Sequence, residues 1–96
     1  VSGSQVVSGN DNVVTFNASA ATAALDEIQK SFNREPINTD DKESALELLD
    51  EINTKINQNK KPSVIKSALI GLKDFALNVG ANVTAALIAA KIQGLF

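Results

Sequence analysis

The last third of the chain, residues 64–96, is apolar on nearly every side when it is read as a helix. At about 100° per residue, its aliphatic and small residues fall on one inward stripe. That stripe consists of Ile65, Leu69, Leu72, Ala76, Val79, Val83, Leu87 and Ala90. A helix this apolar must be covered by the rest of the protein or by a partner. We therefore expect a helix over 63–95 that packs in a small bundle.

Four further aliphatic residues lie beside the lysines on the opposite side of this expected helix. Lys66, Lys73, Thr84 and Lys91 mark its solvated side. Next to them, and away from the inward stripe, lie Ile70, Leu77, Ile88 and Leu95. A monomer offers these four side chains no evident cover, so we predict that they contribute to self-association.

The composition argues against an enzyme. The 96 residues suffice for one domain at most, which buries a modest share of its surface. They include no Cys, His, Trp, Tyr or Met. This removes disulfides, thiolate and imidazole chemistry and the usual soft metal ligands. We expect no catalytic activity, no cofactor and no metal.

The charge of the chain is unevenly distributed. Its net charge is −2, but in residues 64–96 three lysines oppose Asp74 alone, which leaves +2 there and −4 elsewhere. Most of the negative charge lies in one stretch, on Asp40, Asp41, Glu43, Glu47, Asp50 and Glu51. These carboxylates alternate with apolar residues and are expected to be solvated. The chain has no concentrated basic, aromatic-rich surface, so we expect no nucleic-acid partner.

The first 17 residues predict a short β element. Val, Ser and Thr alternate there with Gly, Asn and Asp, which favours two strands around a turn at 9–12. The pairs Val6-Val7 and Val13-Val14 would point to opposite faces of a strand, so both faces carry apolar side chains. An isolated hairpin is marginal in water. We therefore predict that these four valines also take part in self-association.

Two amphipathic helices are predicted before the long one. The first runs over 19–34, capped by Asn17 or Ser19, and ends at Glu35 because the next residue is proline. The second runs over 40–57, with a start at Asp40 and Glu43 that resembles a capping box, although Asn38 or Thr39 also suits the cap position. The predicted fold is mainly α. A short N-terminal β-hairpin (1–17) precedes a helical domain (18–96) of three helices, the last two of which form an antiparallel hairpin.

Two glycines interrupt the predicted long helix. Gly71 and Gly80 each cost roughly 1 kcal/mol of helix propensity relative to alanine. We expect this cost to be offset by close helix packing at Gly71, Ala76 and Gly80, or else to mark a kink.

Two other interpretations of the sequence are weaker. Asn10-Asp11-Asn12 could belong to a calcium turn, but its spacing fits no complete calcium loop, and a plain turn is favoured. The least polar run, residues 75–90, contains Asn78, Asn82 and Thr84 and is shorter than the ~20 apolar residues that a membrane span requires. Membrane insertion is therefore the less favoured expectation.

The arrangement as a whole resembles a known bacterial family. A Val- and Asn-rich segment (6–14), an acidic helix (40–57) and the run Lys-Pro-Ser-Val-Ile-Lys-Ser-Ala-Leu-Ile-Gly-Leu-Lys (61–73), which leads into a Gly- and Ala-rich terminal helix, are similar to the C-terminal region of AbiTii-type abortive-infection proteins. The resemblance covers nearly the whole chain and is compositional more than residue-exact. It implies a cytoplasmic bacterial protein linked to phage defence, in which this part serves as an assembly tail.

Two functions follow from these expectations. The first is a non-enzymatic oligomerisation or interaction domain of a bacterial antiphage protein, which forms a homo-oligomer through the β segment, the last helix or both. The alternative is a membrane-active or pore-forming helical segment that stays soluble until it is triggered.

Overall fold

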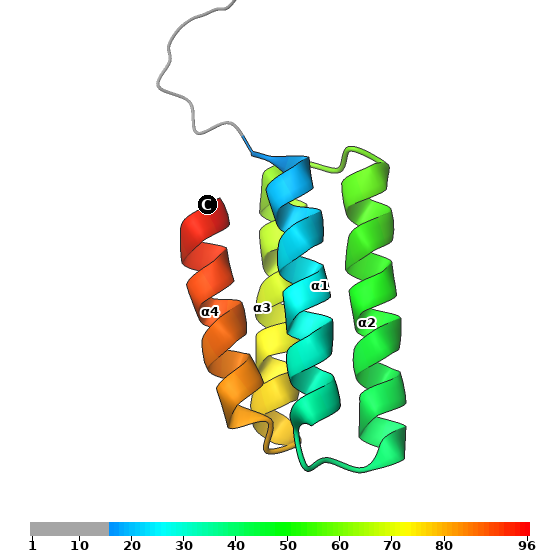
Figure 1. Cartoon of the computed structure of the whole chain (residues 1–96). Coiled ribbons are helices and arrows are strands. Elements are labelled where there is room, and N and C mark those ends of the chain that lie inside the picture. Colours follow the sequence, from blue (N-terminus) through cyan, green and yellow to red (C-terminus); the bar gives the residue numbers. More distant parts are fainter. Residues whose placement is uncertain (1–15) are drawn as a thin grey trace, which may run out of the picture.

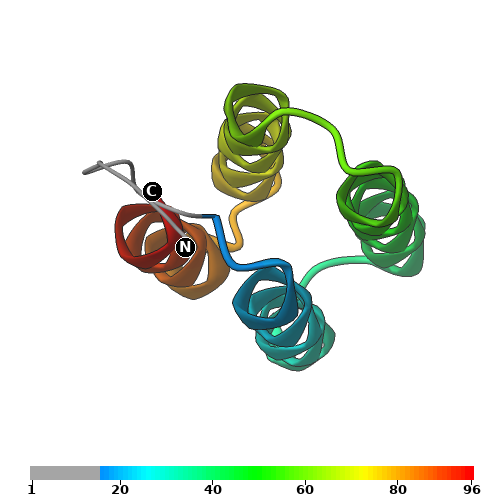
Figure 2. The same ribbon diagram turned by 90° about the horizontal axis from the view of Figure 1, so that it is seen from above.

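The computed structural model describes residues 16–96, which form an antiparallel bundle of four helices (Figure 1). The helices are α1 (Ala18–Arg34), α2 (Thr39–Asn57), α3 (Pro62–Asn78) and α4 (Asn82–Leu95). Seen along the bundle axis, each helix packs against its two neighbours in chain order, and α4 closes the ring against α1 (Figure 2). The prediction of a mainly helical fold with α2 and α3 antiparallel is confirmed. The predicted hairpin and its valines Val6, Val7, Val13 and Val14 lie outside the described residues.

The first two helices begin and end close to the predicted positions. The side chain of Asn17 accepts a hydrogen bond from the backbone N–H of Ala20 at 3.0 Å and caps α1. Asn38, rather than Asp40, caps α2, because its side chain accepts from the N–H of Asp41 at 2.7 Å. The backbone of Glu35 is extended, as the following proline requires, and this ends α1.

The prediction of one long helix over 63–95 is wrong, because the chain reverses between α3 and α4. Gly80 has φ +85°, a left-handed conformation that glycine adopts without steric cost. The N–H of Ala81 donates to the carbonyl of Ala76 at 2.8 Å, and the N–H of Gly80 donates to that of Leu77 at 3.2 Å. This pair of bonds is a Schellman motif, which terminates a helix. The predicted helix is therefore two antiparallel helices joined by a turn at 79–81, whereas the sequence suggested a kink at most.

The close helix packing predicted at the two glycines is not observed. A Cβ atom added at Gly71 or Gly80 would meet no atom of residues 16–96 within 4 Å. Gly71 is exposed on α3, and Gly80 serves the turn through its backbone conformation. Ala76, by contrast, is fully buried in the core, as expected.

The reversal also changes which residues of α4 face the core. Ile65, Leu69, Leu72 and Ala76 of the predicted stripe are buried, but Val83 is 73 % exposed. In its place Ala85 and Ile88 point inward. Thr84 also points inward and is fully buried, so its expected position on the solvated side is wrong. Because the turn at 79–81 breaks the progression of about 100° per residue, the register of α3 does not continue into α4.

Side chains from all four helices fill the centre of the bundle. The largest of the fully buried apolar side chains are Phe32, Ile28, Ile65, Leu69, Leu72 and Ile88. At one end of the bundle the rings of Phe16 and Phe96 stack with their centroids 5.3 Å apart. The two ends of the described chain therefore lie next to each other.

The two glycines make a matched pair of predictions. Gly80→Ala should lower the free energy of unfolding by about 1 kcal/mol or more, because alanine resists positive φ. Gly71→Ala should raise it by roughly 0.5–1 kcal/mol, because an exposed helical position gains propensity there. Urea denaturation of both variants measures the difference. Equal effects of the two substitutions would contradict the turn at Gly80.

Candidate functional site

The four residues of the last third that were predicted to mediate self-association have different environments. Leu77 and Ile70 are 52 % and 38 % exposed, so both are available to a partner. Leu95 is partly buried against the core. Ile88 is fully buried, and its assignment to the surface is wrong because the turn at 79–81 rotates it inward. Ile70 and Leu77 thus remain as the exposed pair.

Ile70 and Leu77 belong to a continuous line of side chains along α3. Lys66, Ile70, Lys73 and Leu77 follow one another at intervals of one helical turn, and we call these four residues the α3 strip. On the other side of α3, Val64 and Ala68 line a surface pocket with Lys55 of α2. The α3 strip therefore lies on the side of α3 next to α4.

The outer surface of α4 is also apolar. Lys91 is the one charged residue in its sequence, and its ammonium group lies 3.0 Å from the carboxylate of Glu27 on α1. Below this ion pair, small and aliphatic residues of α1 and α4 line a pocket of about 330 Å³. They include Ala20, Ala24, Leu87, Ala90, Gly94 and Leu95. The surface of α4 itself thus offers little charge to water.

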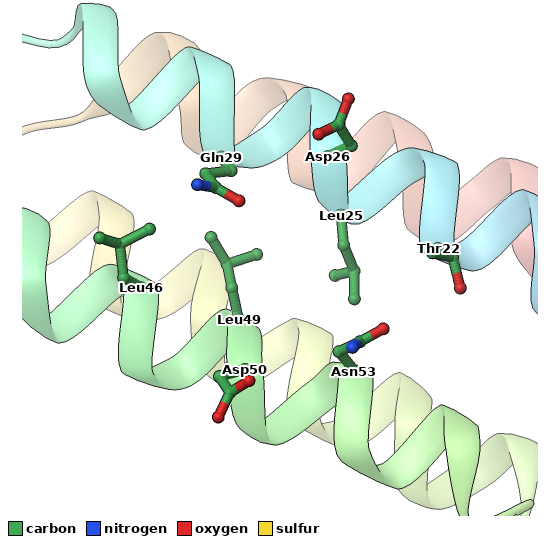
Figure 3. Close-up of a pocket in the computed structure, with 8 residues that line it drawn as sticks. All are labelled: Thr22, Leu25, Asp26, Gln29, Leu46, Leu49, Asp50 and Asn53. Carbon is green, nitrogen blue, oxygen red and sulfur yellow. The ribbon is translucent and has the colours of Figure 1, made fainter.

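A groove with a different character lies between α1 and α2. It has a volume of about 370 Å³, and Leu25 and Leu49 point toward each other across it (Figure 3). Leu46 on its rim is 40 % exposed. The rim also carries the carboxylates of Asp26 and Asp50 and the polar residues Thr22, Gln29 and Asn53. This groove combines an apolar floor with an acidic edge.

A buried polar cluster joins the end of α1 to the start of α4. Glu35 is only 9 % exposed, and its carboxylate accepts a hydrogen bond from the backbone N–H of Thr84 at 2.8 Å. The hydroxyl groups of Thr84 and Ser31 lie 2.6 Å apart and share a hydrogen bond. Thr84 is fully buried. All three polar side chains thus find partners in one another or in the backbone.

The geometry of this cluster indicates a structural role. Helix α4 begins after Ala81, which has no side-chain oxygen to accept from the first free N–H groups. Glu35 supplies that acceptor from 49 residues earlier in the chain, and its negative charge suits the positive end of the helix dipole. The carboxylate of Glu35 accepts from a backbone N–H, whereas the hydroxyl groups of Ser31 and Thr84 bond to each other. The carboxylate therefore acts as a helix cap. Sequence reasoning missed this role of Glu35. The signal was an alanine at the cap position of α4, where Ser, Thr, Asp or Asn would supply an oxygen, but the start of this helix was not predicted.

The described chain offers no evident metal centre and no membrane span. Residues 16–96 contain no group of three or more Asp or Glu side chains that could hold a metal ion. None of the four helices seen there combines the length and apolarity that crossing a bilayer requires. The features that could engage a partner are therefore the α3 strip, the α4 surface and the α1–α2 groove.

The role of Glu35 can be tested by truncation. Glu35→Ala should lower the free energy of unfolding by about 1.5–3 kcal/mol, because it leaves a buried N–H at the start of α4 without its charged acceptor. Glu51→Ala, on the exposed side of α2, should stay within about ±0.5 kcal/mol. Thermal melts followed by circular dichroism compare the two variants. A loss at Glu35 no larger than at Glu51 would contradict the cap.

Comparisons of the chain with protein-family models, with curated proteins and with solved structures give no match. The similarity to AbiTii-type proteins stays a prediction from the sequence. Function must therefore be argued from the surfaces of the four-helix bundle.

Proposed function

We propose that this chain is a non-enzymatic self-association module and that it assembles through the α3 strip. The observation that carries the proposal is the exposure of Ile70 and Leu77, which lie two turns apart on one side of α3. Two helical turns separate their Cα atoms by about 10.5 Å. Aliphatic anchors at this spacing are typical of a helix that packs lengthwise against another helix or into a groove.

Burial of Ile70 and Leu77 supplies part of the free energy that assembly requires. Full burial of an aliphatic side chain stabilises a complex by roughly 1.5–3 kcal/mol. Two such anchors do not by themselves outweigh the loss of translational and rotational freedom. Further apolar surface of α3 and α4 must therefore join the contact, and the near absence of charge on α4 makes this surface easy to desolvate.

The biological setting of this module is part of the same proposal. The AbiTii-like arrangement of the sequence supports a bacterial cytoplasmic protein in phage defence, in which assembly of this domain brings copies of a larger protein together. Deletion of residues 16–96 from that protein should then abolish both its oligomeric state and its protection against phage. Plaque assays alongside size-exclusion chromatography test the link.

Self-association predicts a defined response to one surface substitution. Leu77→Asp should weaken assembly while helix content stays intact, because it places a charge on one of the two apolar anchors of the proposed contact. Val64→Asp is the matched control, since Val64 is also an exposed aliphatic residue of α3 but faces the α2 side. Light scattering and sedimentation over a concentration series, from well below to well above micromolar, measure both. A wild-type chain that is monomeric at every concentration would refute the proposal.

A further inference from the structure

We infer that the α3 strip of one copy docks into the α1–α2 groove of a second copy, with α3 and α2 antiparallel. This inference rests on the proposed self-association and adds the acceptor surface and the register of the contact. The occupant of the groove is thus a second copy of this chain.

The two surfaces have matching patterns. On α2, Leu46 and Asp50 line the groove. Glu43 lies about one turn before Leu46, so the helical spacing sets the exposed leucine between two carboxylates. On α3, Ile70 lies between Lys66 and Lys73 in the same way. In both helices the two charged residues are seven positions apart, or about 10.5 Å. The charges on the two surfaces have opposite sign.

Only one direction of pairing aligns all three positions. If the helices are antiparallel, Lys66 meets Asp50, Ile70 meets Leu46 and Lys73 meets Glu43. If they are parallel, the lysines still meet carboxylates, but Ile70 meets Glu47 and its aliphatic side chain has no apolar partner. In the antiparallel register Ile70 faces Leu46 and lies next to the apolar floor of the groove, which Leu25 and Leu49 form (Figure 3).

The electrostatics favour this contact over pairing of the strip with its own copy. Helix α2 carries six carboxylates and two lysines, whereas α3 carries two lysines and one carboxylate. Within residues 16–96, neither lysine of the strip has an ion-pair partner within 4.0 Å, and neither do Glu43 and Asp50 of α2. Asp26, on the α1 side of the groove, already pairs with Lys30. Two strips placed face to face would bring like charges together. When the strip packs in the groove, the lysines of α3 and the carboxylates of α2 neutralise each other.

A single molecule cannot make this contact internally. The strip lies on the side of α3 next to α4, and the groove lies between α1 and α2, on the opposite side of the bundle (Figure 2). Each copy therefore offers one donor surface and one acceptor surface. Such a contact is heterologous, so the copies form a ring if the rotation closes and a growing chain if it does not.

The inference is tested by charge exchange in the full chain. Lys66→Glu and Asp50→Lys should each weaken self-association by about three- to tenfold, measured by sedimentation at low ionic strength. An equimolar mixture of the two variants should regain assembly, because the new carboxylate of one variant then meets the new ammonium group of the other, while the remaining contacts are native. The double variant K66E/D50K should also regain it. Glu51→Lys, the same kind of charge reversal at the next residue but on another side of α2, is the control and should have no such effect.

The outcomes separate this inference from the proposed function. Weakening by each single variant, with recovery in the mixture, establishes the pairing of strip and groove. If Leu77→Asp disrupts assembly but the charge variants do not, the strip mediates self-association with another acceptor, and the inference is overturned while the proposed function stands. If the mixture stays as weak as the single variants, the register is wrong. A monomeric wild-type chain overturns both.

Discussion

The architecture depends on the left-handed backbone of Gly80. A straight helix over 63–95 would outrun the two preceding helices and leave much of its apolar surface without cover. The turn at 79–81 divides it into two segments of lengths similar to those of α1 and α2, so that four helices enclose one core. Ala76 and Ala81, which flank the turn, are both fully buried, so apolar burial accompanies the hydrogen bonds of the turn. A change of sign in one φ angle thus separates a three-helix arrangement with an uncovered end from a closed bundle.

Glu35 links this turn to the rest of the fold. Proline at position 36 ends α1, and the extended backbone of Glu35 brings its carboxylate to the start of α4. The cap, the hydroxyl pair of Ser31 and Thr84, and the ion pair of Glu27 and Lys91 all join the first and last helices. These polar contacts between α1 and α4 fix the rotation of α4 about its axis. The sequence of α4 is apolar on several sides and does not by itself determine which side faces the core. The orientation of the exposed surface therefore depends on side chains that lie outside it.

Within residues 16–96, local patterns in the sequence predicted α1 and α2 well and the last third of the chain less well. The spacing of Ala21, Leu25, Ile28 and Phe32, and the signals around Pro36 and Pro62, were sufficient for α1, α2 and the start of α3. The reversal was missed because a glycine inside a helical pattern marks a kink, a close contact or an end, and periodicity alone does not distinguish them. Of the predicted surface residues, Ile70 and Leu77 precede the turn and are exposed as predicted, whereas Ile88 follows the turn and is buried. The groove between α1 and α2 arises only once the helices pack.

The stacking of Phe16 on Phe96 has a consequence for how this bundle can be built into larger proteins. An even number of antiparallel helices brings the point of entry and the point of exit of the chain to the same end. A host protein can therefore carry the bundle inside a surface loop without separating the two sides of that loop. For the same reason, a circular permutant whose old ends are joined near the two phenylalanines and whose new ends open in the polar connection at 58–61 preserves the packing of all four helices.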